Sequence, residues 1–290
     1  MDIGGHRLYL CRMGRSCQLG HPTVILEAGH SDWSHCWTQI QPEIARFARV
    51  IAYDRAGFGW SDPGPLPRSP VRLVTELHEL LLRAGEPGPF VFVGHSLGAA
   101  LGRLFASLYP EDVVGMVWVD SAHEQMQKYL SFWKAAYRGM VISGHLGAFL
   151  ARAGLVRRFG RKLMIAATPS AQTPEDQETL VAQMSGPRFF ETMRDETLGW
   201  FPAVNWACER PALGDLPVIM IEARYPPETG RGYPPRQWRE FRAGWASIQE
   251  DLSRLSTRTW RITVETGHNV MHARPDVIIQ AVRDMAELLG

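Results

Sequence analysis

The eight residues Val-Phe-Val-Gly-His-Ser-Leu-Gly, numbered 91–98, form the pattern from which the rest of the chain can be interpreted. A short apolar run ends in Gly-x-Ser-x-Gly, and a helical pattern follows at once. This order predicts a sharp strand-to-helix turn, in which Gly94 and Gly98 allow a strained backbone and close packing. The turn would expose the Ser96 hydroxyl at the carboxyl edge of a sheet, beside a helix N-terminus that favours negative charge. We therefore interpret Ser96 as a nucleophile rather than as a serine that merely occupies a tight turn.

Short apolar runs and helical patterns alternate on both sides of this turn. Strands are predicted at 23–27, 50–53, 90–93, 113–119, 216–221 and 259–265, helices at 33–48, 71–84, 99–108, 235–255 and 275–289, and a hairpin at 3–10. Such alternation is typical of an α/β fold, in which helices cover both faces of a mostly parallel sheet.

The alternation stops over residues 124–212, where large apolar residues recur at helical spacing without a convincing strand. A segment of this length is too long to be a simple connection. We interpret it as a helical cap inserted into the sheet domain. The predicted organisation is a core of residues 1–123 and 213–290 with a cap of residues 124–212.

Composition argues against several classes of function. The chain has 290 residues, 45% of them hydrophobic, and a net charge of +1, so neither nucleic acid nor an anionic membrane is indicated as a partner. A membrane span would need about 20 apolar residues, and we find neither such a run nor a signal peptide. The four cysteines form no CxxC pair, which favours free thiols in a reducing, cytoplasmic setting. They are Cys11, Cys17, Cys36 and Cys208.

Four motifs make the chain resemble the α/β-hydrolase superfamily over nearly its whole length outside the cap. They are Glu27-Ala28-Gly29-His30, the run YDRAGFGWS at 53–61, Gly94-His95-Ser96-Leu97-Gly98 and Thr266-Gly267-His268. The chain looks most like capped bacterial serine hydrolases of the esterase type, and the resemblance implies an eight-stranded, mostly parallel sheet. One departure is Ala28-Gly29, where many members have His-Gly, but this change leaves the backbone donors available.

A serine hydroxyl is a weak nucleophile at neutral pH, so it needs a neighbouring base that a third group orients. His268 is the expected base, because it follows the strand at 259–265 and a glycine at the same sheet edge as Ser96. His272 and His123 are the alternatives, since each lies near a proposed site loop.

The acid is expected at Asp120, at the end of the strand that follows the nucleophile helix, where one branch of the superfamily has its acid. The more usual position lies after the strand at 216–221, and no aspartate occurs there. Glu222 and Glu228 in that loop remain alternatives, and so does a chain without a working acid. The structural alternative for Asp120 is that it only caps the turn that follows it.

The resemblance also implies an oxyanion hole formed by the backbone N–H groups of His30 and Leu97. Arg55, at the end of another strand, is expected to form a structural ion pair. The side chains expected to contact substrate are Ser31, His95 and His123.

These expectations describe a serine hydrolase without cofactor or metal that cleaves a small to medium, moderately apolar carboxylic ester through an acyl-enzyme. Serine rather than aspartate at the turn argues against haloalkane dehalogenases and epoxide hydrolases. Thioesterase, lactonase, amidase, carbon–carbon bond hydrolase and cofactor-free haloperoxidase chemistry remain open, because a fold does not fix the substrate. A ligand receptor that keeps the fold is the alternative from another class, and the sequence leaves open a homodimer formed through the cap.

Overall fold

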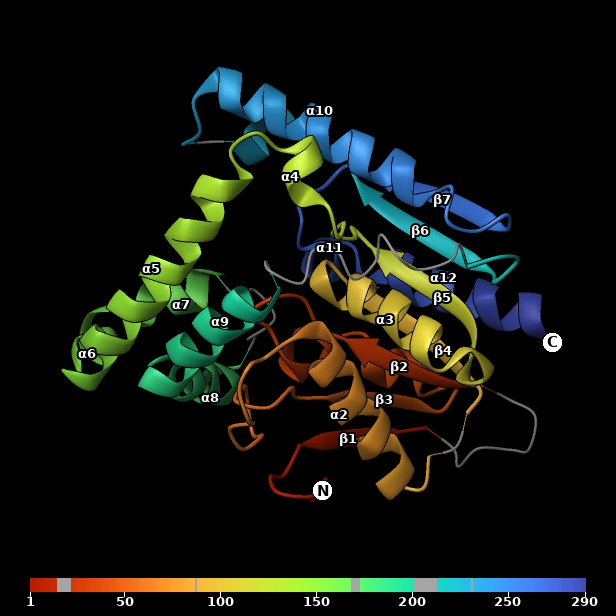
Figure 1. Ribbon diagram of the computed structural model, residues 1–290, viewed down its shortest axis with the longest axis horizontal. Coiled ribbons are helices and arrows are strands. Elements are labelled where there is room, and N and C mark those ends of the chain that lie inside the picture. Colours follow the sequence, from red (N-terminus) through yellow and green to blue (C-terminus); the bar gives the residue numbers. More distant parts are fainter. Residues whose placement is uncertain (15–21, 87, 168–172, 201–212, 231) are drawn as a thin grey trace.

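The computed structural model describes residues 1–14, 22–86, 88–167, 173–200, 213–230 and 232–290 (Figure 1). The described strands form one seven-stranded sheet in the order β1-β3-β2-β4-β5-β6-β7. They are β1 (Leu10–Met13), β2 (Thr23–Glu27), β3 (Val50–Tyr53), β4 (Phe90–His95), β5 (Val113–Val119), β6 (Val218–Ala223) and β7 (Thr259–Val264). Strand β1 pairs antiparallel with β3, whereas the other neighbours are parallel. The predicted α/β class with a mostly parallel sheet is confirmed.

Helices cover both faces of this sheet (Figure 1). The core helices are α1 (Gln41–Ile44), α2 (Pro70–Arg83), α3 (Leu97–Leu108), α10 (Pro235–Leu252), α11 (Val270–Ala273) and α12 (Pro275–Leu289), with short 3-10 helices η1 (Ser34–Trp37), η2 (Pro110–Asp112) and η3 (Pro227–Gly230). Gly102 of α3 lies against Phe92 and Met116, whereas Gly115 of β5 lies against Met285 of α12. Because successive strand residues point to opposite faces, α3 and α12 cover opposite faces of the sheet.

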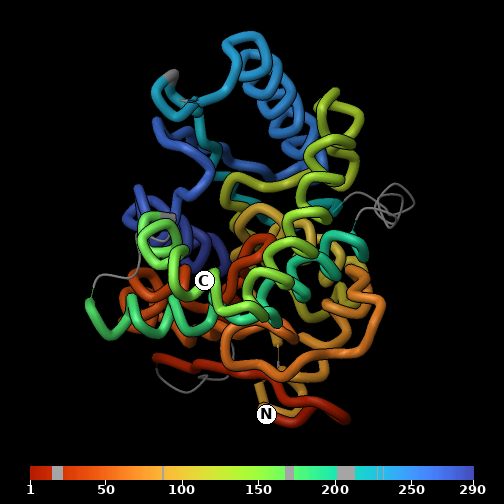
Figure 2. The backbone as a smooth tube through the Cα atoms, turned by 90° about the vertical axis from the view of Figure 1, so that its left-hand side faces the viewer, coloured from red at the N-terminus to blue at the C-terminus, as the bar shows by residue number. Residues whose placement is uncertain are grey.

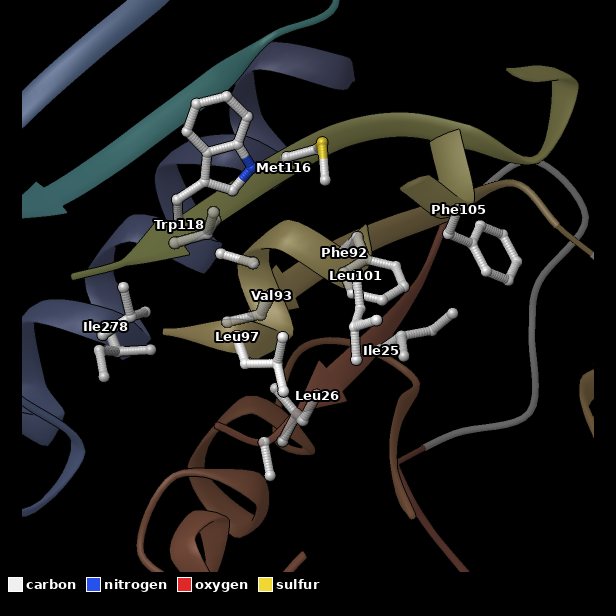
Figure 3. Close-up of a cluster of buried hydrophobic side chains, with 14 of the residues drawn as sticks. Ile25, Leu26, Phe92, Val93, Leu97, Leu101, Phe105, Met116, Trp118 and Ile278 are labelled. Atoms are coloured by element: carbon white, nitrogen blue, oxygen red, sulfur yellow. The ribbon is translucent and has the colours of Figure 1, made fainter. Parts of the chain in front are cut away.

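The centre of the sheet is buried on both sides. Every residue of β2, β3 and β4 is buried, which is why these strands appear in the sequence as continuous apolar runs rather than as alternating patterns. Figure 3 shows part of this core, where Phe92, Leu101 and Phe105 lie close together beneath Met116 and Trp118 of β5. The buried centre holds the carboxyl ends of β4 and β5 in fixed register, and these ends carry the candidate site.

A helical insertion lies between β5 and β6 and forms a separate lobe beside the sheet (Figure 1). Its helices are α4 (Met126–Tyr129), α5 (Trp133–Arg152), α6 (Leu155–Phe159), α7 (Arg161–Ala167), α8 (Pro174–Met184) and α9 (Pro187–Trp200). Helix α5 packs along α9, where Gly144 and Gly147 lie against Phe190. We propose residues 124–212 as the extent of this cap, of which 168–172 and 201–212 lie outside the described residues.

The prediction of an eighth strand is wrong for the described part of the chain. The predicted hairpin at 3–10 is reduced to one isolated bridge between Asp2 and Arg7, on either side of a loop in which Gly4 and Gly5 both adopt positive φ. The regular antiparallel strand begins only at Leu10. The sheet therefore has seven strands, with β1 at its edge.

The prediction of a single helix at 33–48 is also wrong. Pro42 lies in the middle of this segment, and proline lacks an N–H and disfavours helical backbone in the residue before it. The chain instead forms η1, followed by the one-turn helix α1 with Pro42 in its first turn. The prediction followed the helical spacing of the apolar residues and gave Pro42 too little weight.

Among the described helices, none is long and apolar enough to cross a membrane. Of the four cysteines, Cys11 and Cys36 are free thiols. Cys17 and Cys208 lie outside the described residues.

Candidate active site

Ser96 lies in the turn between β4 and α3, where the sequence predicted a strained backbone. Its φ of 51° and ψ of −116° are rare for a residue with a side chain. Two hydrogen bonds hold this conformation: the Ser96 N–H donates to the Val119 carbonyl, and the Ser96 carbonyl accepts from the Ala122 N–H, each at 3.0 Å. These two bonds fix the backbone on both sides of the Ser96 Cα to the end of β5 and the loop that follows it.

The two glycines of the turn are required by close packing. A methyl group on Gly94 would lie 2.5 Å from the backbone nitrogen of Ala99, and one on Gly98 would lie 2.4 Å from the Glu27 carbonyl oxygen. Both distances are far below ordinary contact, so neither position accepts a side chain. The Gly-x-Ser-x-Gly pattern therefore matches the geometry that it predicted.

His268 follows β7, and its ring faces the carboxyl end of β5. The distance from His268 Nδ1 to Asp120 Oδ2 is 2.6 Å, and Asp120 is fully buried whereas the His268 side chain is 36% exposed. A carboxylate accepts only, so Nδ1 carries the proton and Nε2 is left with its lone pair. This is the tautomer that a general base requires.

Asp120 accepts hydrogen bonds on both oxygens. Oδ1 accepts from the backbone N–H of Ala223 at 3.1 Å and from Trp245 Nε1 at 2.9 Å, while Oδ2 also accepts from the Tyr225 hydroxyl. Burial, together with the Asp120 charge, raises the pKa of Tyr225 well above its ordinary value, so this hydroxyl remains a donor. The donors compensate a carboxylate that has no contact with water.

Ser96 and His268 line the same cavity, whose volume is about 560 Å³. Most of its wall is apolar or aromatic and comes from the cap, from α10 and from Tyr233 just before α10. The residues concerned are Met126, Phe132, Trp133, Tyr137, Met140, Trp200, Tyr233, Trp238, Phe241 and Trp245. Such a wall favours an organic substrate with a substantial apolar part.

The loop after β2 packs against the nucleophile turn. A methyl group on Gly29 would lie 3.4 Å from the Ser96 Cβ, so this backbone borders the place where a substrate carbonyl would sit. His30 comes next, and both His30 and Leu97 line the cavity. Leu97 is the first residue of α3, where a backbone N–H has no partner within the helix.

Comparison with known proteins agrees with this architecture. A sequence profile of the "Alpha/beta hydrolase family" matches residues 20–281. The chain belongs to the α/β hydrolase family. This match confirms the predicted superfamily, and the solved structures confirm the predicted fold.

Relatives of this α/β hydrolase differ in chemistry. An AB hydrolase superfamily protein of Gibberella zeae is 32% identical over 133 residues, which cover 44% of this chain and 38% of that protein. A thermophilic esterase from Thermogutta terrifontis has a TM-score of 0.66 at 19% identity, with 98% of this chain and 94% of the esterase covered. The epoxide hydrolase CorEH has a TM-score of 0.72 at 18% identity, with 99% and 97% covered. The chain spans less than half the length of the first curated relatives it matches.

Two of the predicted substrate contacts of the α/β hydrolase lie elsewhere. The Ser31 hydroxyl is 3.0 Å from His30 Nδ1, and it supports that ring rather than the cavity wall. His123 Nε2 is 3.1 Å from Asp251, and its Nδ1 accepts from the Gln125 N–H. Neither Ser31 nor His123 is among the described residues that line the cavity.

His95, the third predicted contact, does line the cavity. Its Nε2 is 3.0 Å from the backbone carbonyl of His268, so Nε2 carries a proton and donates it. Burial lowers the pKa of His95 well below its ordinary value and keeps the ring neutral. His95 therefore holds the loop that carries His268.

The structure also places the alternative acids, Glu222 and Glu228, and the other alternative base, His272. Glu222 accepts from Arg261 at 2.5 Å, and Glu228 is exposed. Burial lowers the pKa of His272 to about 4. Of these residues, none lies among the described residues that line the cavity.

Arg55 does more than the structural ion pairing that the sequence suggested. Its guanidinium donates to the carbonyls of Ala28 at 2.8 Å and Gly29 at 2.7 Å, which fixes the backbone that leads to His30. It also pairs with Glu27 at 2.8 Å and with Glu196 of cap helix α9 at 2.7 Å. The Arg55 side chain is 2% exposed and both carboxylates are 1% exposed, so these charges are desolvated and mutually dependent.

Arg55→Lys is expected to lower kcat at least about tenfold with KM nearly unchanged, because one ammonium cannot serve two carbonyls and two carboxylates. Arg55→Met, which leaves two buried carboxylates unpaired, should lower the free energy of unfolding by about 3–5 kcal/mol. Steady-state kinetics and urea denaturation measure the two effects. The control is Arg68→Met, which breaks another buried pair, with Glu76, and should cost stability but not kcat. Wild-type kcat in Arg55→Lys would show that the guanidinium does not position this loop.

Asp32 is a partly buried carboxyl that sequence reasoning missed. It lines the cavity, and its Oδ1 accepts from the Trp33 N–H at 2.9 Å. Burial raises the pKa of the Asp32 carboxyl from its ordinary 3.8 to about 6. Because the folded state holds this proton more tightly than the unfolded state does, stability falls as pH rises from about 4 to about 6 and stays low above that.

Asp32→Asn should therefore raise the free energy of unfolding at pH 8, by at most about 3 kcal/mol for a difference of about two pKa units. The gain should shrink below pH 4, where both states are protonated. Urea denaturation at several pH values measures it, with the exposed Asp215→Asn as control. An Asp32→Asn protein whose stability matches wild type at every pH would contradict the raised pKa.

Proposed function

We propose that this α/β hydrolase is a serine hydrolase that cleaves carboxylic esters through an acyl-enzyme. The observation that carries the proposal is the 2.6 Å contact between His268 Nδ1 and buried Asp120, with His268 and Ser96 on one cavity wall. That contact favours the His268 tautomer whose Nε2 can accept the hydroxyl proton. The strained turn at Ser96 supports the nucleophile assignment.

In the proposed first half-reaction, Ser96 Oγ attacks the ester carbonyl carbon while His268 Nε2 takes the hydroxyl proton. The carbonyl oxygen becomes an oxyanion, which accepts hydrogen bonds from the backbone N–H groups of His30 and Leu97. Each such donor contributes about 3 kcal/mol to the stability of the transition state. Collapse of the intermediate breaks the bond to the alcohol, which leaves with the proton from His268.

In the second half-reaction, water attacks the acyl carbon and gives a proton to His268. The acid is released when the bond to Ser96 Oγ breaks and the proton returns to that oxygen. Asp120 remains ionised throughout and stabilises the imidazolium that forms twice in each cycle. The aromatic cavity wall supports a moderately apolar acyl or alcohol group of small to medium size.

The test is a panel of p-nitrophenyl esters of increasing acyl length, together with a thioester, a lactone and an amide. We expect a burst of p-nitrophenol equal to the enzyme concentration, and an acyl adduct on the peptide that contains Ser96 in mass spectrometry. The ester should give the largest kcat/KM of the panel. Saturable binding of these compounds without turnover or adduct would instead indicate a receptor, and adducts elsewhere would refute the Ser96 assignment.

A further inference from the structure

The outer surface of the cap exposes large apolar side chains. Ile142, Leu146 and Phe149 of α5 are 64%, 55% and 66% exposed, and Phe159 and Leu163 of α6 and α7 are 71% and 75% exposed. We call these five residues, with Arg157, Arg158 and Lys162 between them, the cap-tip surface. It lies at the edge of the molecule away from the sheet (Figure 1), and Figure 2 views the molecule from this side.

Helix α5 is apolar on two faces for different reasons. Gly144 and Gly147 face α9 and allow it to approach closely. Ile142, Leu146 and Phe149 are four and three residues apart, so they form one stripe on another face, which is exposed. A contiguous exposed apolar stripe on a protein of this size indicates an interaction surface.

The chain segment that carries this stripe is basic. Between Glu124 and Glu175 the chain has no acidic residue but eight lysines and arginines. Arg152 and Arg161 pair with Glu191 and Glu178 of the neighbouring helices. The other basic side chains are found on α4, α5, α6 and α7. They are Lys128, Lys134, Arg138, Arg157, Arg158 and Lys162.

The three basic residues of the cap-tip surface remain available to a partner. Arg157, Arg158 and Lys162 are exposed, and within the described part of the chain no acidic side chain pairs with them. The Arg158 guanidinium lies 5.4 Å from the centre of the adjacent Phe159 ring. Basic and aromatic groups are therefore presented together.

We propose that the cap-tip surface docks on an anionic phospholipid bilayer. Apolar side chains can enter the acyl boundary while arginine and lysine reach the phosphates, which is the pattern of interfacial helices. A second copy of the chain would bring two positive surfaces together, so the charge argues against self-association here. The net charge of +1 gave no hint of this, because acidic residues elsewhere balance a cap that is locally basic.

Docking would bring the substrate cavity close to lipid. Trp133, Tyr137 and Met140 of α5 line the cavity, whereas residues 142–149 of the same helix carry the exposed stripe. Apolar molecules dissolved in the bilayer would then lie near the cavity wall. The binding itself requires no turnover, so it can be tested whether or not the ester reaction is correct.

Flotation with vesicles tests this proposal. We expect the full chain to bind vesicles of phosphatidylcholine mixed with phosphatidylglycerol, not phosphatidylcholine alone, and to release at high salt. Arg157→Glu with Arg158→Glu should weaken binding at least about 30-fold, and Phe149→Ser with Phe159→Ser should weaken it comparably. The control pair Arg239→Glu and Arg242→Glu makes the same charge change on α10 and should bind like wild type.

Light scattering and turnover of a water-soluble ester, measured on every variant, separate the outcomes. Unchanged turnover in the cap-tip variants shows that the fold is intact. Equal loss of binding in the control pair would mean non-specific charge attraction and would overturn the proposal. So would the absence of binding to the mixed vesicles, or a dimer that the cap-tip variants dissociate, since the occupant would then be a second copy.

Discussion

Asp120→Asn is expected to lower kcat by about 10⁴-fold, which is the size of effect seen when a triad loses the correct histidine tautomer. The asparagine oxygen can still accept from Ala223 and Trp245, so the fold should survive. The amide NH₂ group would then face His268 Nδ1 and favour the tautomer with the proton on Nε2. Steady-state kinetics on the best ester, with urea denaturation of the same protein, measures both effects.

The matched controls are Glu222→Gln and Glu228→Gln, which alter the two alternative acids. Both should keep wild-type kcat, because Glu222 pairs with Arg261 and Glu228 is exposed. Near-normal turnover in Asp120→Asn, together with a large loss in either control, would transfer the role of the acid to the loop after β6.

Ser96→Ala is expected to lower kcat by about 10⁶-fold and to abolish the burst, since no acyl-enzyme can form. Alanine keeps the Cβ at the positive φ of this position, so the turn gains no steric conflict. Binding of an unreactive ester analogue should be nearly unchanged, and calorimetry can measure it. Residual turnover, due to the oxyanion donors alone, should be small and independent of pH near neutrality.

Ser143→Ala, an exposed serine on α5, is the control for this variant and should behave like wild type. If Ser96→Ala retained a burst, another nucleophile would carry the acyl group, and the adduct would identify it by mass spectrometry. Retained turnover without a burst would point to direct attack by water.

The positions of Ser96, Asp120 and His268 could be predicted because each lies at the carboxyl end of a strand. In a parallel sheet these ends meet at one edge, so alternation of strands and helices is enough to bring them together. The strands themselves were visible as continuous apolar runs. Two predicted elements failed, the hairpin at 3–10, which is reduced to one bridge, and the helix at 33–48, which Pro42 interrupts.

The partners that complete the site could not be predicted in this way. Trp245 contacts Asp120 across 125 residues of chain, and only the packing of α10 brings it there. Tyr225 had a sequence signal: it follows β6, where most relatives were expected to have an acid, and its hydroxyl reaches Asp120 instead. Glu196 meets Arg55 across 141 residues and comes from a cap whose helices the sequence did not place.

The ion pair between Glu196 and Arg55 limits the routes by which substrate can enter and leave the cavity. Separating α9 from the core would break the buried ion pair between Glu196 and Arg55, so such opening should be rare. It would also release the loop that leads to His30. Exchange of substrate and product should therefore use the side of the cavity formed by α5 and α10, so that the catalytic backbone stays assembled from one turnover to the next.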